Sequence, residues 1–245
     1  MTEERRSPVR RALSHPLTHL IAATLILALT QAFVVKLFRV PSGSMEQTLE
    51  IGDRIFVNRL AYGAPVVHGT PDNGDIVVFH TQDDLWPRSS DTSNGSSALD
   101  GLKHAARWAL GDVLGFGPGT RHMIVKRVIG TPGQTVECCD AEGRLMIDGV
   151  PLDEPYVFED LPFVARELDC ETEQRSSRCF PPIEVPADRL LVLGDHRGAS
   201  SDAVSHCRAG TEPTGAECVR WVRTEDVIGE VLVRVWPLGS LGGVE

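Results

Sequence analysis

The longest apolar stretch of the chain lies near its N-terminus. No Asp, Glu, Lys or Arg occurs between Arg11 and Lys36, and Leu20 to Val35 is almost wholly apolar. A helix needs about 20 residues to cross a bilayer. His19 to Phe38 supplies that length if Lys36 extends its ammonium group to the interface. The pattern therefore predicts one transmembrane anchor over residues 12–39.

Residues 1–11, in front of this stretch, form a short basic tail with four arginines and two glutamates. Basic flanks stay on the cytoplasmic side of a membrane. We therefore expect a cytoplasmic N-terminus, a single pass through the plasma membrane and an extracytoplasmic body. A cleaved secretory signal peptide is the alternative, but Thr30-Gln31-Ala32 is a poor small-x-small cleavage site. Both interpretations export the body.

From residue 40 onward the pattern changes to short runs that are continuously apolar or that alternate apolar with polar residues. Such runs, separated by turn residues such as Asp148-Gly149, predict strands and hairpins. The predicted strands are Arg54–Asn58, Asp75–Phe79, Met123–Ile129, Thr135–Glu137, Leu145–Ile147, Leu190–Leu193 and Val227–Val235. The body, residues 40–245, is thus predicted to be mostly β.

Two segments interrupt the strand pattern. Residues 81–121 contain a Ser/Asp/Asn-rich loop and, over Leu102 to Leu114, an amphipathic helix. Such a helix more often packs on a core, although resting on a membrane surface is an alternative. Residues 153–186 are acidic and contain prolines and two cysteines. We expect both segments to be insertions or loops on the body.

The charge balance excludes one class of partner. The chain carries 34 acidic and 24 basic residues, a net charge of -10. Binding of phosphate backbones needs a basic face, so nucleic acid is not an expected partner. Hydrophobic residues at 42% are typical of a folded globular body.

The six cysteines fit an exported protein. In an oxidising compartment, cysteines that bracket short loops can be bridged. The candidate disulfides are Cys170 with Cys179 and Cys207 with Cys218, although six cysteines permit 15 connectivities. The adjacent Cys138 and Cys139 are interpreted as buried hydrophobic residues. No Cys-x-x-Cys spacing is present, so a zinc site is not expected.

Ser44 is a candidate nucleophile within Pro41-Ser42-Gly43-Ser44-Met45. A serine hydroxyl attacks only when a base removes its proton. Gly43 allows a backbone N–H to approach a substrate closely, and Ser42 could donate its hydroxyl to a developing oxyanion. On composition alone, a solvated turn is the alternative.

Lys126 is a candidate base because it lies in the apolar run Met123 to Ile129. Burial disfavours the charged ammonium and lowers the pKa of a lysine toward neutrality. A strand lysine that points to water is the alternative. A Ser-His-Asp arrangement is a second alternative, but adjacent residues such as Asp195 and His196 point to opposite sides of a strand.

Four separated segments resemble the conserved boxes of bacterial type I signal peptidases, the leader peptidases. Their order and spacing match that family, the apolar anchor precedes the first, and the resemblance covers about residues 15 to 240. The segments are Pro41–Leu49 followed by Gly52-Asp53, Gly74–Phe79, Lys126–Gly133, and Gly194–Asp202.

The resemblance implies a Ser/Lys serine endopeptidase. Ser44 corresponds to the nucleophile, Lys126 to the base, and Ser42 to an oxyanion donor. Ser200 corresponds to the serine that hydrogen-bonds the lysine, and Asp202 to an acidic residue that supports this region. The positions that match shallow substrate pockets are Val40, Pro41, Met45 and Val125.

The resemblance also implies a fold and a substrate. The expected body consists of coiled antiparallel β-sheets whose apolar surface dips into the lipid bilayer. The expected substrates are signal peptides of exported preproteins with small residues at −1 and −3. No metal and no cofactor is implied.

The chain departs from the family pattern in two boxes. Gln47 replaces a proline, so we expect a less rigid turn after Ser44. In the last box His196, Gly198, Ala199, Ala203 and Val204 replace family residues. We therefore expect the Asp–Arg ion pairs of this loop to be partly lost. Two alternatives stay open: a related Ser/Lys peptidase with a dedicated surface-protein substrate, and an inactive paralogue that only binds exported chains.

Overall fold

The structure is a computed structural model that describes residues 15–62, 69–80, 86, 101, 123–208 and 215–244. The chain divides into two compact units. The smaller comprises residues 1–36 and 94–120, and the larger comprises residues 37–93 and 121–245.

The smaller unit contains helix α2, Pro16–Phe33. The helix begins with proline at its first position, where no backbone N–H is needed, and His15 caps it by accepting a hydrogen bond from the Leu17 N–H at 3.2 Å. Among the helices within the described ranges, none combines the length and the apolarity needed to cross a membrane.

The predicted anchor of residues 12–39 is wrong at its C-terminal end. The helix stops at Phe33, and strand β1 occupies Val35–Arg39. The β-branched pair Val34-Val35 disfavours helix, and the strand that follows gains backbone hydrogen bonds by pairing with β2.

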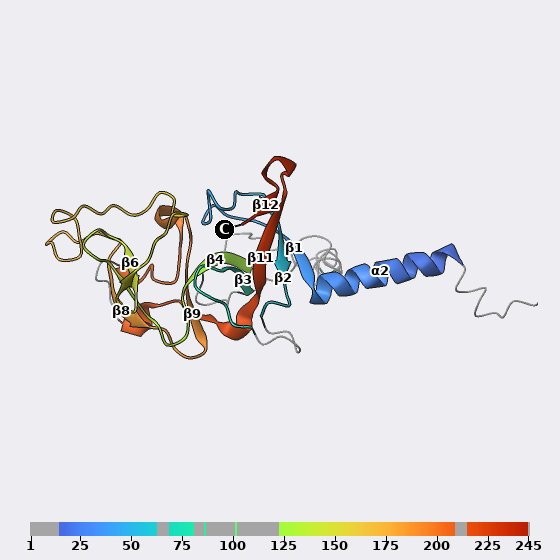
Figure 1. Cartoon of the computed structure of the whole chain (residues 1–245), viewed down its shortest axis with the longest axis horizontal. Helices are drawn as coiled ribbons and strands as arrows, with labels where there is room; N and C mark the ends of the chain where they lie inside the picture. The colour runs from blue at the N-terminus through green and yellow to red at the C-terminus, as the bar shows by residue number, and fades with distance from the viewer. Residues whose placement is uncertain are drawn as a thin grey trace, which may run out of the picture. The chain divides into compact units, whose positions relative to one another are not determined.

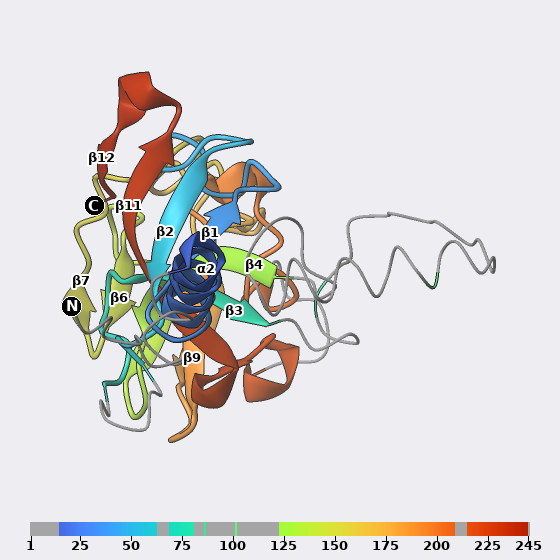
Figure 2. The same ribbon diagram turned by 90° about the vertical axis from the view of Figure 1, so that its right-hand side faces the viewer.

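The larger unit is built on an antiparallel sheet in the order β1-β2-β11-β3-β4-β9-β10, with β12 paired to β11. Figures 1 and 2 show the long β11 beside β2 and β12. The strands are β2 (Arg54–Asn58), β3 (Ile76–His80), β4 (Met123–Gly130), β9 (Arg189–Leu193), β10 (Val222–Arg223), β11 (Val227–Trp236) and β12 (Gly242–Gly243).

A second, smaller antiparallel sheet has the order β7-β6-β5-β8. Its strands are β5 (Thr135–Cys138), β6 (Leu145–Ile147), β7 (Val150–Pro151) and β8 (Phe180–Glu184). Short 3-10 helices complete the fold: η2 (Arg197–Ala199), η4 (Gly215–Cys218), η5 (Thr224–Asp226) and η6 (Leu238–Ser240). The prediction of a mostly β body of antiparallel sheets is confirmed.

Two hydrophobic clusters hold the larger unit together. The first joins residues of both sheets, including Phe79, Ile183 and Leu191. The second lies under the loop between β1 and β2 and contains Met45 and Leu49 from that loop. Burial of one large apolar side chain stabilises a fold by about 2 kcal/mol. The burial of Met45 and Leu49 therefore fixes the segment that carries Ser44.

The two predicted excursions differ in what the structure describes. The amphipathic helix expected over residues 102–114 lies outside the described residues. Residues 153–186 leave the small sheet after β7 and return through β8, and the bridge between Phe158 and His196 pairs them with the loop after β9.

All six cysteines are joined in pairs. The structure links Cys170 to Cys179 and Cys207 to Cys218. It also links Cys138 to Cys139. The interpretation of that adjacent pair as unbonded hydrophobic residues is therefore wrong. A strand places successive side chains on opposite faces, but β5 ends at Cys138, so the alternation does not extend to its neighbour.

Candidate active site

Lys126 lies in the middle of β4, opposite Val77 of β3, with only 2% of its surface exposed. Its Nζ donates a hydrogen bond to Ser200 Oγ at 2.9 Å. Burial lowers the pKa of Lys126 to about 8, although the nearby carboxylates of Asp202 and Asp195 act in the opposite direction. Roughly a quarter of the amine is then neutral at pH 7.5, against about a thousandth for a lysine in water.

Ser44 lies in the loop between β1 and β2 and is 8% exposed. Its carbonyl oxygen accepts a hydrogen bond from the backbone N–H of His196 at 3.2 Å. The next residue, Met45, is buried, and its carbonyl accepts from the Leu49 N–H at 2.6 Å. The serine is therefore fixed both by the core and by the loop that follows β9.

Gly194 brings the two halves of the site together. A Cβ at this position would collide with both Ser200 Oγ and the carbonyl oxygen of Ser44. The three groups are therefore immediate neighbours, and only glycine leaves room for them. Since Ser200 also accepts from Lys126, Ser200 lies between the Lys126 amine and the backbone of Ser44.

The remaining predicted residues divide by burial. Ser42 and Pro41 are exposed on the loop before Ser44. The other three positions expected to shape substrate pockets belong to one buried hydrophobic cluster: Val40, Met45 and Val125.

Asp202 is fully buried and forms an ion pair with Arg208 at 3.1 Å. It also accepts a hydrogen bond from Ser205 at 3.0 Å. The expectation that the Asp–Arg ion pairs of this loop would be partly lost is wrong here. The arginine simply comes from outside the matched segment, six residues beyond the aspartate.

The other charges of the loop are paired as well. Asp195 receives two hydrogen bonds from Arg127, at 2.9 and 2.8 Å, and the Arg127 guanidinium stacks over Tyr156 at 3.8 Å. Such bidentate pairs are stronger and more directional than single contacts. Arg197 pairs with Glu154 of the 153–186 excursion. Sequence reasoning missed these partners, because they are distant in the chain and no pattern selects one arginine or glutamate among many.

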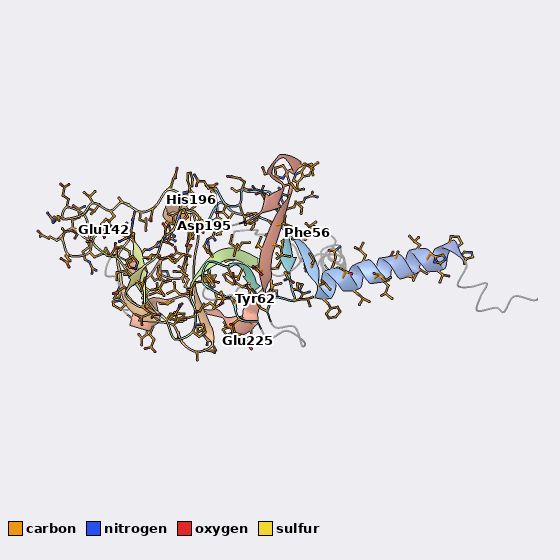
Figure 3. All side chains as sticks on the ribbon, viewed as in Figure 1. Phe56, Tyr62, Glu142, Asp195, His196 and Glu225 are labelled. Carbon is orange, nitrogen blue, oxygen red and sulfur yellow. A yellow bond between two sulfur atoms is a disulfide. The ribbon has the colours of Figure 1, made fainter. Side chains whose placement is uncertain are left out.

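Within the described residues, the ring of His196 is hydrogen-bonded to carboxylates and not to Ser44. The His196 ring lies between two carboxylates, with Nδ1 2.7 Å from Glu46 Oε2 and Nε2 3.2 Å from Glu159 Oε2. Figure 3 shows His196 beside Asp195. The predicted alternative of an Asp195–His196 base therefore has no support in this geometry. His122 lies outside the described residues.

One group of side chains in the described ranges has a spacing that suits a metal ion: Cys139, Cys170 and Cys179. Each of these sulfurs already belongs to a disulfide. A metal ligand must be a thiolate, so this group does not suit a metal as it stands.

Comparisons with known proteins agree on one family. The family model "Signal peptidase, peptidase S26" matches residues 13–236. A probable signal peptidase I of Mycobacterium leprae is 32% identical, over 86% of this chain and 72% of that protein. Signal peptidase I of Mycobacterium tuberculosis is 32% identical, over 99% of this chain and 79% of that protein.

A more distant relative and a solved structure carry the same name. Signal peptidase I of Leptolyngbya laminosa is 30% identical, over 91% of this chain and 79% of that protein. A crystal structure of a signal peptidase I from Enterococcus faecalis V583 covers 66% of this chain and 96% of its own, with 24% identity and a TM-score of 0.30. On the family match and the sequence relatives, the chain belongs to the signal peptidases of family S26, serine endopeptidases that act on the signal peptides of exported preproteins.

Proposed function

We propose that Ser44 and Lys126 form a Ser/Lys dyad that removes signal peptides from exported preproteins. The observation that carries the proposal is the burial of Lys126, which lowers its pKa to about 8 beside Ser200 and the Ser44 loop. A neutral amine at this place accepts the proton of Ser44. Ser200 orients the amine, since its hydroxyl accepts from Nζ.

Acylation then involves two proton transfers. Ser44 Oγ attacks the scissile carbonyl as its proton passes to Lys126, and the ammonium returns that proton to the leaving amine. An acyl-enzyme remains. The neutral lysine takes a proton from the attacking water and returns it to Ser44 Oγ as the acyl bond breaks, which releases the carboxylic acid and restores the serine. The Ser42 hydroxyl and the Ser44 N–H stabilise the oxyanion, a contribution of about 3 kcal/mol per donor in serine proteases.

We also propose a preference for small residues at −1 and −3. In support, Val40, Met45 and Val125 belong to one buried hydrophobic cluster, and we propose that this cluster forms an apolar floor beneath the substrate side chains. We propose that the substrate binds extended, as a strand added to a sheet edge, which presents alternate side chains to this floor.

We further propose that the protein acts at the lipid bilayer, with residues 1–11 in the cytoplasm. Large apolar side chains are exposed along α2, among them Leu20, Ile21, Leu25, Ile26 and Phe33. The body exposes another set on β2, β11 and the segment after it: Phe56, Leu232, Trp236, Leu238 and Leu241. We propose that each of these two sets of apolar side chains faces lipid, and Figure 3 shows Phe56 of the body well apart from Asp195 and His196.

The deciding experiment is cleavage of a purified preprotein in detergent micelles. The wild-type chain should release the mature protein, and Ser44→Ala and Lys126→Ala should not. Wild-type chain that binds the preprotein without cleaving it would favour the inactive paralogue. Rescue of cells depleted of their signal peptidase separates a general enzyme from one with a dedicated surface-protein substrate. A reporter fused after Glu245 that is active in the cytoplasm would contradict the proposed topology.

A further inference from the structure

His196 links the loop that carries Ser44 to the excursion of residues 153–186. Its backbone N–H donates to the Ser44 carbonyl at 3.2 Å. Its ring contacts Glu46 on the Ser44 loop at 2.7 Å and Glu159 on the excursion at 3.2 Å. We infer that His196 is a positioning residue, which holds the Ser44 loop against the loop after β9 through its contact with Glu46.

Glu46 carries this restraint back to the nucleophile. One carboxylate oxygen faces His196, while the other folds over Gly43, where any Cβ would collide with it. The Glu46 N–H also donates to the Gly43 carbonyl at 3.1 Å. The side chain therefore bridges from the ring to the residue directly before Ser44. An ionised carboxylate only accepts hydrogen bonds, so Nδ1 is the donor in the contact with Glu46.

The excursion fixes the other side of His196. The Phe158 N–H donates to the Asp195 backbone carbonyl at 2.9 Å. The Arg197 N–H donates to the Phe158 backbone carbonyl at 3.2 Å, and the Gly198 N–H donates to the Glu159 backbone carbonyl at 2.9 Å. The Phe158 ring packs edge-on against the imidazole, with centroids 5.0 Å apart. These contacts keep the imidazole in place even without the Glu159 carboxylate.

Burial decides which carboxylate matters more. The Glu46 side chain is 28% exposed, whereas that of Glu159 is 67% exposed. Exposed charge pairs contribute little because water and salt screen them. The remaining charged groups around the ring already have partners: Asp195 pairs with Arg127, and Arg197 pairs with Glu154. The contact with Glu46 therefore carries the restraint.

Two substitutions separate the contacts of the ring. In His196→Asn, the side-chain amide replaces Nδ1 and still donates to Glu46. In His196→Gln, the amide reaches the place of Nε2 instead and the contact with Glu46 is lost. His196→Ala removes both, and Glu159→Gln serves as the control for the exposed side.

The inference rests on the proposed function, so the test has two readouts. Preprotein cleavage should show kcat reduced about tenfold in His196→Ala and His196→Gln with little change in KM, since a misplaced nucleophile loses rate rather than binding. His196→Asn and Glu159→Gln should stay within about twofold of wild type. Amide hydrogen exchange of residues 41–49 should quicken only in the two slow variants.

The results distinguish the two hypotheses. A wild-type chain that cleaves nothing refutes the proposed function, while hydrogen exchange still decides the role of His196. Equal kcat and equal exchange in the asparagine and glutamine variants would refute the positioning role. If His196→Ala loses structure, seen as a lowered Tm, the comparison between His196→Asn and His196→Gln tests the positioning role.

Discussion

The Lys126 amine donates a hydrogen bond to Ser200 Oγ at 2.9 Å, and Lys126 has almost no contact with solvent. The cost of burying a charge lowers the pKa of that amine to about 8. The lysine is therefore partly neutral at physiological pH, and several consequences are measurable.

The first concerns the pH dependence of activity. Only the neutral amine can accept the proton of Ser44, so kcat/KM should rise with pH along a limb with its midpoint near 8. Lys126→Arg should be as inactive as Lys126→Ala, because arginine stays protonated in proteins. A pH profile on a preprotein or peptide substrate checks both. An active arginine variant would remove Lys126 from the role of base.

The second concerns stability. The pKa of Lys126 is lower in the folded chain than in the unfolded chain, so the unfolded state binds more protons between about pH 8 and 10.5 and stability rises with pH in that window. Below pH 8 the full cost of burying the ammonium is present, about 3 kcal/mol. Lys126→Met should therefore be inactive and yet more stable at pH 7, by about 2 kcal/mol.

Denaturant unfolding at pH 7 and at pH 10 measures this gain, which should shrink at the higher pH. Ser44→Ala is the matched inactive control and should gain nothing. A methionine variant less stable than wild type at pH 7 would contradict the burial cost.

The third concerns the ion pair between Asp202 and Arg208. Removing one partner of a buried pair leaves an uncompensated charge and costs about 3 kcal/mol or more. Arg208→Ala should lower the free energy of unfolding by that amount, whereas Arg175→Ala, at an exposed position, should change it by less than about 0.5 kcal/mol. Equal effects in the two variants would show that Arg208 is not the partner of Asp202.

The fourth concerns Gln47, which has a φ of 72°. Proline, the residue that the signal peptidases usually have here, is locked near −65°. Gln47→Pro should therefore destabilise the chain by at least about 2 kcal/mol. Gln47→Gly should stay within about 0.5 kcal/mol of wild type, since glycine adopts a positive φ without a steric cost. Thermal unfolding of the two variants checks the contrast, and a proline variant as stable as wild type would contradict it.

The fifth concerns the disulfide between Cys170 and Cys179, which are nine residues apart. A loop of this size predicts a stabilisation of about 2–3 kcal/mol. Unreduced peptide mapping should recover the two cysteines in one linked species, and the double alanine variant should lose that much stability. Two free thiols in chain purified from an oxidising compartment would reject the pairing.

The strands of the body could be predicted from the sequence because their side chains alternate in polarity or run continuously apolar. Met123 to Ile129 and Leu190 to Leu193 both lie within observed strands, β4 and β9. The end of the N-terminal helix could not be predicted from the sequence. An apolar run reads the same in a helix and in a strand, and whether Val35–Arg39 joins a sheet depends on a partner 19 residues further on.

Some residues of the candidate site could likewise be predicted from the sequence, and others could not. Ser44 and Lys126 could be proposed from the segments around them, since both segments resemble a known family. The partners of Asp195, Arg197 and Asp202 could not, because an ion pair depends on three-dimensional distance and the chain carries 24 basic residues. The substitutions in the loop suggested lost pairs, while the fold supplies replacements from other segments.

The order of residues in β4 has a consequence for evolution. Lys126 and Arg127 are successive, and their pairing opposite Val77 and Ile76 directs the first toward Ser200 and the second toward Asp195. A deletion or insertion that slipped β4 by one residue against β3 would put Arg127 opposite Val77 in one direction and Val125 there in the other. Either a permanent cation or an apolar side chain would then stand where the proposed Ser/Lys mechanism needs a titratable amine. The register of β4 against β3 is therefore under the same selection as the lysine itself. Insertions and deletions should be tolerated in the turns around β4 but not within the strand.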